Sequence, residues 1–292
     1  MDLRALRTFL AVVDAESFSA AATRLSCTQS AVSQQIAALE RDVGATLVSR
    51  RPVRPTAAGE ALADDAREIL TRADAATAQV LRVANAGTDR RPPRLSVTPG
   101  VEATLQGAWL PGGLASVQVD PPREAAAALR SGSVDLVVLD GVIAPGDPLP
   151  VDLPAGVTAR VLMERPVELA LPATHRLGER DSLDISSLGA VRWIDAPNLG
   201  GPLSTVEDAA RTGLRLGLRY EGQSMTSLMA LVAADAGVAM VPAGVEVPEA
   251  LQHRVALVPV RRPRLTYRVE VWWHTDDRST VVSAARWLTG QG

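Results

Sequence analysis

The residues LSCTQSAVSQQIAALE, at positions 25–40, decide the fold of the first part of the chain. Thr28 is a good N-cap residue, and we expect a helix from Gln29 to about Asp42, ended by Gly44. Three apolar residues recur at helical spacing and predict the buried face of this helix: Val32, Ile36 and Leu39. The opposite face is polar and therefore open to a binding partner.

A helix-turn-helix pattern surrounds this stretch. A helix with an apolar face from Leu3 to Val13 follows the N-cap residue Asp2, and a short helix over residues 20–25 follows the expected N-cap Ser19. The polar face of the third helix carries side chains that can reach base edges or phosphates in a DNA groove: Thr28, Gln29, Ser30, Ser33 and Gln34. A solvated polar face is the alternative interpretation of such a helix.

Arginines follow the third helix on a predicted ribbon. Residues 47–50 and 53–55 are expected to be short extended segments around a turn at Arg51 and Pro52. The segment from 46 to 59 contains no acidic residue and three basic ones: Arg50, Arg51 and Arg54. A basic wing of this kind reaches phosphates or a narrow minor groove, which favours DNA binding.

A long helix is expected from Ala57 to about Ala86, with Thr56 as its N-cap. Its apolar residues alternate at the spacing of a coiled-coil seam: Leu62, Ala66, Ile69, Ala73, Ala76, Val80 and Val83. We predict that this helix pairs with its copy in a second chain, and an amphipathic helix packed on its own domain is the alternative. Residues 87–93 have the composition of a linker.

The remainder of the chain alternates between β-type and helical patterns. The expected strands cover residues 95–98, 117–119, 134–139, 167–171, 238–241 and 269–273. The expected helices cover residues 125–130, 204–212, 225–234 and 279–288. This alternation predicts an α/β fold in which helices sandwich the sheets.

The composition is typical of a globular chain with about two domains. Of the 292 residues, 47% are hydrophobic and 22% are charged, and the formal net charge is −3. The small net charge argues against a protein that coats nucleic acid by bulk charge. The sequence has no apolar run as long as a membrane span and no signal-peptide pattern, and its single cysteine is Cys27. These features favour the reducing cytoplasm.

The sequence offers little to a metal ion or to catalysis. Its three histidines are isolated, and the metal-ligand spacings C-x-x-C and H-x-x-x-H do not occur. No arrangement of a nucleophile, a histidine and an acid is visible either. We therefore expect no metal, no cofactor and no enzymatic activity.

Residues 1–60 resemble the winged helix-turn-helix domain of LysR-type transcriptional regulators. The matching stretches are LRTFLAVV from Leu6, ESFSAAA from Glu16, LSCTQSAVSQQIAALE from Leu25, VGATLVSR from Val43 and TAAG from Thr56. Val48 departs from the pattern, because the family usually has phenylalanine there. The departure weakens one packing contact of the wing and leaves the DNA-facing residues untouched.

The rest of the chain resembles, more weakly, the effector domain of the same family. The matching stretches are RSGSVDL from Arg130, ERPVELALP from Glu164 and LVAADAGVAMVP from Leu231. That domain has a periplasmic-binding-protein-like architecture of two α/β subdomains joined by two crossover strands. The resemblance implies a winged helix-turn-helix domain at 1–58, a linker and dimerisation helix at 59–92 and an effector domain at 93–292. Subdomain I would comprise 93–163 and 267–292, and subdomain II 164–266.

Two departures concern the effector domain. Only a short helix over residues 101–109 fits where the family has a longer one that helps to pair effector domains, so a tetramer is less strongly implied than a dimer. Asp235 replaces a family glycine and places a carboxylate after the helix of residues 225–234.

The resemblance places the effector in a cleft between the two subdomains. The residues carried over to this cleft lie at strand exits and helix starts: Thr98, Pro99, Gly100, Pro121, Pro122, Pro202, Leu203, Ser204, Ser224 and Thr226. Free N–H groups at helix starts favour anions. No basic residue is firmly placed in the cleft, so a monocarboxylate or a neutral metabolite is expected rather than a multiply charged anion. Capping of their own helices is the alternative role of Ser204 and Thr226.

The resemblance implies a LysR-type transcriptional regulator whose sequence-specific binding to promoter DNA is modulated by a small-molecule effector. Its expected partners are double-stranded operator DNA, the effector, a second copy of the chain in a homodimer or homotetramer, and RNA polymerase, but no membrane. The alternative is a constitutive DNA-binding protein with a vestigial effector domain. The helix-turn-helix and the lack of catalytic groups disfavour an enzyme or a solute-binding protein.

Overall fold

The structure, a computed structural model, describes residues 2–84, 91–105, 113–275 and 279–289. It separates into two compact units, residues 1–80 and 81–292. Most of the linker predicted at 87–93 and the end of the short helix predicted at 101–109 lie outside the described residues.

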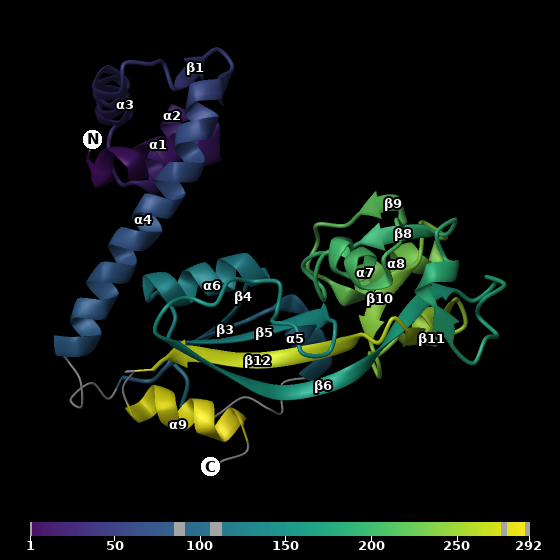
Figure 1. The fold of residues 1–292 in the computed structure, drawn as a ribbon. Helices are drawn as coiled ribbons and strands as arrows, with labels where there is room; N and C mark the ends of the chain where they lie inside the picture. Colours follow the sequence, from purple (N-terminus) through teal and green to yellow (C-terminus); the bar gives the residue numbers. More distant parts are fainter. Residues whose placement is uncertain (1, 85–90, 106–112, 276–278, 290–292) are drawn as a thin grey trace. The chain divides into compact units, whose positions relative to one another are not determined.

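The first unit consists of helices and one β-ribbon (Figure 1). Its elements are α1 (Leu3–Ala15), α2 (Phe18–Arg24), α3 (Gln29–Val43), β1 (Val48–Arg50), β2 (Val53–Pro55) and α4 (Ala57–Ala84). The expected caps of α1 and α3 are confirmed, because the side chains of Asp2 and Thr28 each accept a hydrogen bond from a backbone N–H group. Gly44 ends α3 with a φ of 78°, in the left-handed region that favours glycine.

The second helix begins earlier than predicted. Its N-cap is Ser17 rather than Ser19, and the Ser17 hydroxyl accepts a hydrogen bond from the N–H of Ala20 at 3.2 Å. The earlier start makes Phe18 the first helical residue, and this ring is buried in the core of the unit. Burial of a large aromatic side chain stabilises the observed start of α2.

Helix α4 completes the core of the first unit with its amino-terminal half. Ala63 and Ala66 are buried there, and Leu62 and Ile69 are partly buried against the same core. Farther along the helix, the side chain of Val80 is 67% exposed. The first half of the predicted coiled-coil seam thus packs on its own domain, as the alternative interpretation held. Its second half leaves apolar side chains open to solvent.

Thr56 and Gly59 anchor the start of α4 to the strand before it. The Thr56 hydroxyl donates to the carbonyl oxygen of Thr46 at 2.7 Å and accepts the N–H of Gly59 at 3.1 Å, which confirms Thr56 as the N-cap. Gly59 is buried, and a Cβ atom at this position would overlap the carbonyl oxygen of Leu47. The close approach of the two backbones therefore requires glycine.

The second unit is centred on a mixed sheet with the strand order β4-β3-β5-β12-β6-β11-β7, in which β10 also pairs with β6. The strands of this sheet are β3 (Arg94–Val97), β4 (Ser116–Val119), β5 (Leu136–Ile143), β6 (Val157–Pro172), β7 (Leu183–Asp184), β10 (Ala239–Pro242), β11 (Val255–Arg262) and β12 (Thr266–His274). A parallel pair, β8 (Arg192–Asp195) and β9 (Arg215–Arg219), forms a second sheet. The helices are α5 (Pro99–Leu105), α6 (Pro122–Ser131), α7 (Leu203–Ala210), α8 (Met225–Ala233) and α9 (Ser279–Leu288).

Helices cover both faces of the sheet around β5 (Figure 1). Val137 and Leu139 pack in one apolar cluster with α6, and Leu136 and Val138 pack in another with α9. The predicted sandwich of helices around a sheet is thus confirmed. A strand buried on both faces is apolar almost throughout, and in β5 the exception among the side chains is Asp140.

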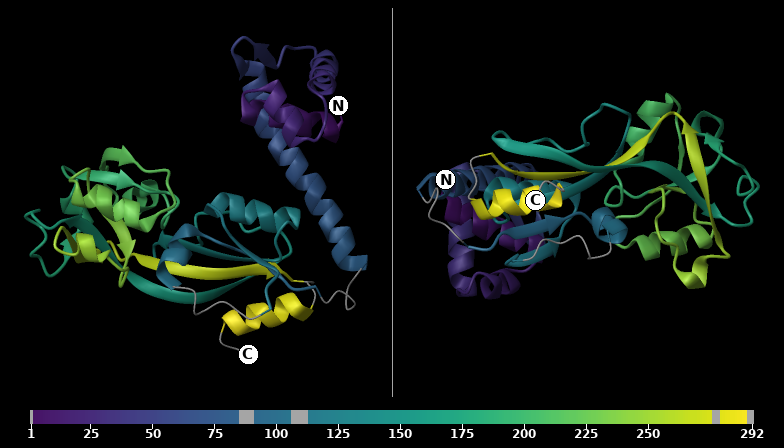
Figure 2. Two further views of the ribbon diagram at one scale, coloured as in Figure 1. Left: turned by 180° about the vertical axis from the view of Figure 1, so that it is seen from behind. Right: turned by 90° about the horizontal axis from the view of Figure 1, so that it is seen from below.

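Two long strands join the two halves of the second unit. β6 pairs with β12 over residues 157–166 and with β10 and β11 over residues 167–172. Figure 2 shows β6 and β12 running together from the side of α9 to the side of α7 and α8. The two crossover strands expected from the resemblance are present. We call the half with α5, α6 and α9 subdomain I and the half with α7 and α8 subdomain II.

Several strands of the second unit differ from the sequence prediction. The strand predicted at 167–171 is the second half of β6, which begins at residue 157. The first half escaped prediction because it is only partly buried and mixes charged with apolar residues. Strands β8, β9 and β11 were not predicted either.

Candidate DNA-binding surface and effector cleft

Helix α3 presents a polar face to solvent. The residues predicted to read bases on this face are exposed or half-buried: Gln29, Ser30, Ser33 and Gln34. Apart from Ser30, their side chains make no hydrogen bond to another described residue. The Thr28 hydroxyl is engaged, because it accepts the N–H of Ala31 at 3.2 Å and lies 3.0 Å from the Ser30 hydroxyl. Uncommitted amide and hydroxyl groups on an open helix face are suited to hydrogen bonding with base edges.

Gln35 lies on the same helix but faces the protein interior. Its Oε1 accepts a hydrogen bond of 2.5 Å from the Thr8 hydroxyl of α1, and Thr8 is 3% exposed. This contact fixes α1 against α3. Gln35 lies three residues after the buried Val32, so helical spacing was the available signal for its inward orientation.

The wing carries exposed arginines. β1 and β2 pair so that Arg50 faces Val53, and Arg50, Arg51 and Arg54 are all exposed. The Arg50 guanidinium lies 5.6 Å from the centre of the Phe18 ring, which is a cation–π contact between the wing and α2. Arg51 and Arg54 form no ion pair within the part of the chain that the structure describes.

Glu40 connects α3 to the wing. Its Oε1 accepts the backbone N–H of Leu47 at 2.9 Å and that of Val48 at 3.2 Å. Charge-assisted hydrogen bonds of this kind hold the end of α3 and the first wing strand in one geometry. Glu40 was not among the predicted site residues, because its partners lie on another element and no local pattern signals the contact.

A cavity of about 510 Å³ opens between subdomain I and subdomain II. Its wall is formed by the start of α6, by β5 and by the segments that follow β5, β8 and β9. The lining residues are Pro121, Pro122, Arg123, Glu124, Asp140, Pro150, Val151, Pro197, Asn198, Gly201, Pro202, Arg219, Glu221 and Gln223. The volume is in the range of pockets that bind small molecules.

Asp140 is the buried acid of this wall. It is 2% exposed, and hydrogen bonds from Thr98 and Tyr267 reach its carboxylate. Burial raises the pKa of Asp140 from 3.8 to about 6, against the lowering effect of these hydrogen bonds. Its second oxygen, Oδ2, is buried, has no hydrogen-bond partner among the described residues and lies against Gly100. Asp140 was not among the predicted site residues, although one acid in an otherwise apolar strand is a visible signal.

The other charged groups of the cleft differ in how they are paired. Arg219 is engaged, because its guanidinium lies 3.2 Å from Asp195 and 3.1 Å from Glu221. Arg123 and Glu124 are exposed and have no ion pair among the described residues. They belong to the first turn of α6, which begins after Pro121 without a side-chain cap. The free N–H groups of that turn give this wall a partial positive charge.

The ten residues predicted to bind the effector are spread over several environments. Pro121, Pro122 and Pro202 line the cleft. Thr98 lies behind the wall, where its hydroxyl donates a hydrogen bond to the lining residue Asp140. Pro99 and Gly100 are buried at the start of α5, and Leu203 lines a smaller pocket.

Three of the four predicted hydroxyl residues are exposed and lie outside the cleft wall. Ser204, Ser224 and Thr226 are exposed. Ser224 is the N-cap of α8 and accepts the N–H of Ser227 at 3.2 Å. Ser204 and Thr226 are second residues of their helices and therefore do not cap them. At the start of α7, the N–H of Leu203 donates to Asp195 instead.

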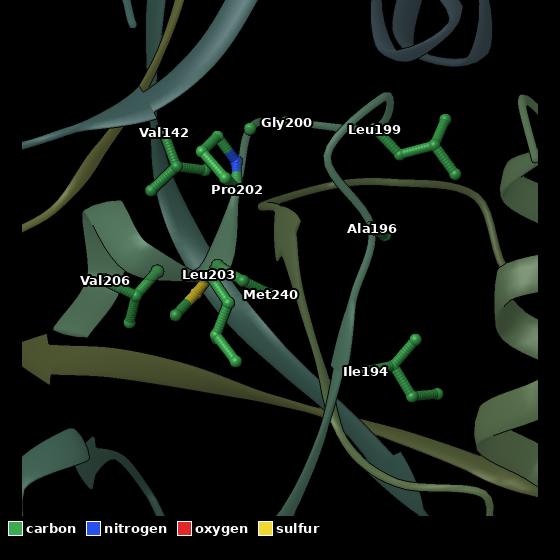
Figure 3. A pocket seen from close by; sticks show the side chains of 10 residues that line it. Val142, Ile194, Ala196, Leu199, Gly200, Pro202, Leu203, Val206 and Met240 are labelled. Atoms are coloured by element: carbon green, nitrogen blue, oxygen red, sulfur yellow. The ribbon is translucent and has the colours of Figure 1, made fainter. Parts of the chain in front are cut away.

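The segment of residues 199–202 crosses from subdomain II to subdomain I. The N–H of Val142 in β5 donates to the carbonyl oxygen of Gly200 at 2.6 Å. Gly200 and Gly201 have φ values of 118° and 106°, which favour glycine. Beside this contact lies an apolar pocket of about 20 Å³, and Figure 3 shows the side chains around it, including Val142 and Met240. It is too small for a metabolite.

Two kinds of site are absent from the described ranges. No group of three or more His, Cys, Asp and Glu side chains in these ranges is arranged to hold a metal ion. No helix in the same ranges combines the length and the apolar character needed to span a membrane.

Two protein-family models match the chain. The model of a bacterial regulatory helix-turn-helix protein of the lysR family matches residues 3–60. The model of the LysR substrate binding domain matches residues 111–289, which is more than half of the chain.

Curated relatives and solved structures cover almost the full length. The chain is 28% identical to the HTH-type transcriptional regulator BudR of Raoultella terrigena, over 97% of this chain and 98% of BudR. It is 30% identical to the uncharacterised HTH-type regulator YnfL of Escherichia coli K12, over 83% and 82% of the two chains. Its fold is similar to that of CbnR, a LysR family transcriptional regulator, with a TM-score of 0.58, 20% identity and coverage of 100% and 99%. The structure of full-length CbnR with its target DNA gives a TM-score of 0.54 at 21% identity and the same coverage.

Proposed function

This chain belongs to the LysR family of transcriptional regulators, with a DNA-binding helix-turn-helix domain and an effector-binding domain, and we propose which residues carry out each task. Gln29, Ser33 and Gln34 read base edges from α3, and Thr28 and Ser30 contact the same groove from its first turn. The arginines of the wing hold phosphates or the minor groove: Arg50, Arg51 and Arg54. Most of these polar groups have no partner among the described residues, which supports the assignment because such groups are free to bind DNA.

The effector site is the cleft between the two subdomains. The observation that carries this assignment is Asp140, a buried carboxylate with an unpartnered oxygen in the wall of a cavity of about 510 Å³. Burial of such a group costs free energy unless a partner satisfies it, and a bound ligand can be that partner. The 199–202 segment, which bridges the subdomains through Gly200, lines the same cleft and can transmit its occupancy.

The test of this function starts with the purified full chain and random DNA fragments. Selection yields an operator, and fluorescence anisotropy then measures the affinity for that operator with and without pools of small metabolites. We expect at least one pool to change the affinity, and Val151→Trp, which fills the cleft, to abolish the change. Affinity that no pool alters would instead support the constitutive DNA-binding protein. An effect that survives Val151→Trp would place the effector elsewhere.

The chain is also proposed to act as a homodimer through α4. The exposed apolar side chains Val80 and Leu81, at 67% and 55%, support this assembly, because a second helix would bury them. Contact with RNA polymerase is proposed from the family alone. In vitro transcription with and without the regulator would reveal it as a change in promoter output.

A further inference from the structure

We propose that the ligand of the cleft is zwitterionic, a small molecule that carries both a protonated amine and a carboxylate, as an amino acid does. The amine would pair with Asp140 and the carboxylate with Arg123 and the first turn of α6. This inference rests on the proposed function of the cleft as the effector site, and it names the chemical class of the effector.

The cationic end of the ligand would bind at Asp140. An ionised carboxylate only accepts hydrogen bonds, and the hydroxyls of Thr98 and Tyr267 leave its Oδ2 without a donor. With a pKa of about 6, the buried carboxyl is mostly ionised above neutral pH, and it would repel an anion placed beside it. An ammonium group supplies both the missing donor and the missing positive charge.

The anionic end of the ligand would bind at another part of the wall, around Arg123. Arg123 is exposed, lines the cavity and has no acidic partner in the described ranges, whereas Arg219 is already paired with Asp195 and Glu221. The first turn of α6 lacks a side-chain cap, so its N–H groups are available to an anion. Glu124 on the same turn lines the cavity as well, which favours one carboxylate over a multiply charged group.

Molecules with a single type of charge satisfy only part of this wall. A dicarboxylate would place one negative group near the buried Asp140. A diamine would place one positive group against Arg123 and the amino-terminal end of α6. A cavity of about 510 Å³ accommodates an amino acid together with ordered water.

The first experiment is a thermal-shift measurement on the full chain above neutral pH. The probes are the proteinogenic amino acids and ornithine, each compared with its deaminated carboxylic acid and its decarboxylated amine. We expect at least one zwitterion to raise the melting temperature in a concentration-dependent manner. Neither half-molecule should do so at about ten times the concentration, because each loses one charge-assisted contact. If no zwitterion raises the melting temperature, the proposal is wrong.

Variants then locate the binding site. Asp140→Asn and Arg123→Gln should each weaken the apparent affinity for the zwitterion by about tenfold or more. Asp181→Asn, an exposed acid outside the cleft, is the matched control and should bind as the parent does. Arg123 is exposed, so its variant keeps the test valid even if Asp140→Asn fails to fold. Binding that neither variant weakens would overturn the assignment.

The outcomes separate this inference from the proposed function. A carboxylic acid or an amine that binds alone with equal affinity, and changes operator affinity, would refute the zwitterion and leave the cleft as the effector site. A zwitterion that depends on Asp140 and Arg123 but leaves operator affinity unchanged would support the ligand class. The same result would refute regulation through this cleft.

Discussion

At the scale of single residues, two variants should distinguish the side chains that contact base edges from those that contact phosphates. Gln29→Ala removes an exposed amide from the polar face of α3. We expect it to weaken the binding free energy for the selected operator by about 1–3 kcal/mol and to relax the sequence preference. Arg54→Ala removes a charge from the wing and should weaken binding to all sequences and reduce the salt dependence. Arg286→Ala, an exposed arginine of α9, is the control for lost charge. Footprinting that shows an unchanged preference for Gln29→Ala would contradict this role.

Asp140 should lower the stability of the protein at neutral pH. Its pKa of 3.8 is raised to about 6 by burial, so the folded state binds this proton more tightly than the unfolded state. The penalty for the ionised form is absent below about pH 4 and complete above about pH 6, where it reaches about 3 kcal/mol. Asp140→Asn should therefore raise the melting temperature near neutral pH, and the gain should disappear on acidification. A gain that is equal at about pH 4 and at neutral pH would rule out burial of the charge as its cause.

At the scale of elements, a side chain at Gly59, where α4 meets the wing, should destabilise the fold. Glycine-to-alanine changes inside helices usually stabilise by up to about 1 kcal/mol. At Gly59 the change to alanine should instead destabilise the protein. We expect the free energy of unfolding to fall by about 1–3 kcal/mol, because the added Cβ overlaps the Leu47 carbonyl oxygen. Differential scanning calorimetry of Gly59→Ala measures this. Gly213→Ala is the control, since a Cβ there meets no atom within 4 Å, and an equal loss in both variants would contradict the argument.

At the scale of the whole molecule, assembly should depend on the exposed part of α4. Ile69 is partly buried against the core of its own domain, so a charge at this position would disturb folding as well as dimerisation. Val80 is 67% exposed, and Val80→Asp should yield monomers with weak operator affinity and an intact fold. Gln79→Asp, at an exposed position one residue off the seam, adds the same charge and should remain dimeric. Analytical ultracentrifugation distinguishes the two, and a dimeric Val80→Asp would move the interface away from this seam.

The sequence by itself determined the amino-terminal domain almost completely. Capping by Asp2 and Thr28, the glycine stop at Gly44 and the buried stripe of α3 depend on neighbours within a few residues, and these local preferences agree with one another. The start of α2 was misplaced, because Ser17 and Ser19 are both good caps and burial of Phe18 decides between them. Propensity alone cannot weigh burial that depends on other helices.

Only the tertiary structure decided the composition of the cleft. Asp140 lies in β5, Arg123 in α6 and Arg219 in β9. These elements are far apart in the chain, and they meet at the cleft because β6 and β12 run from one subdomain to the other. The prediction that Ser204 and Thr226 lie at helix starts is correct, but the prediction that they line the effector cleft is wrong, because neither residue lies in the wall of the cavity. Periodicity and capping describe each element on its own. Which ends of these elements face a common space depends on sheet register and crossover, which act over the whole domain.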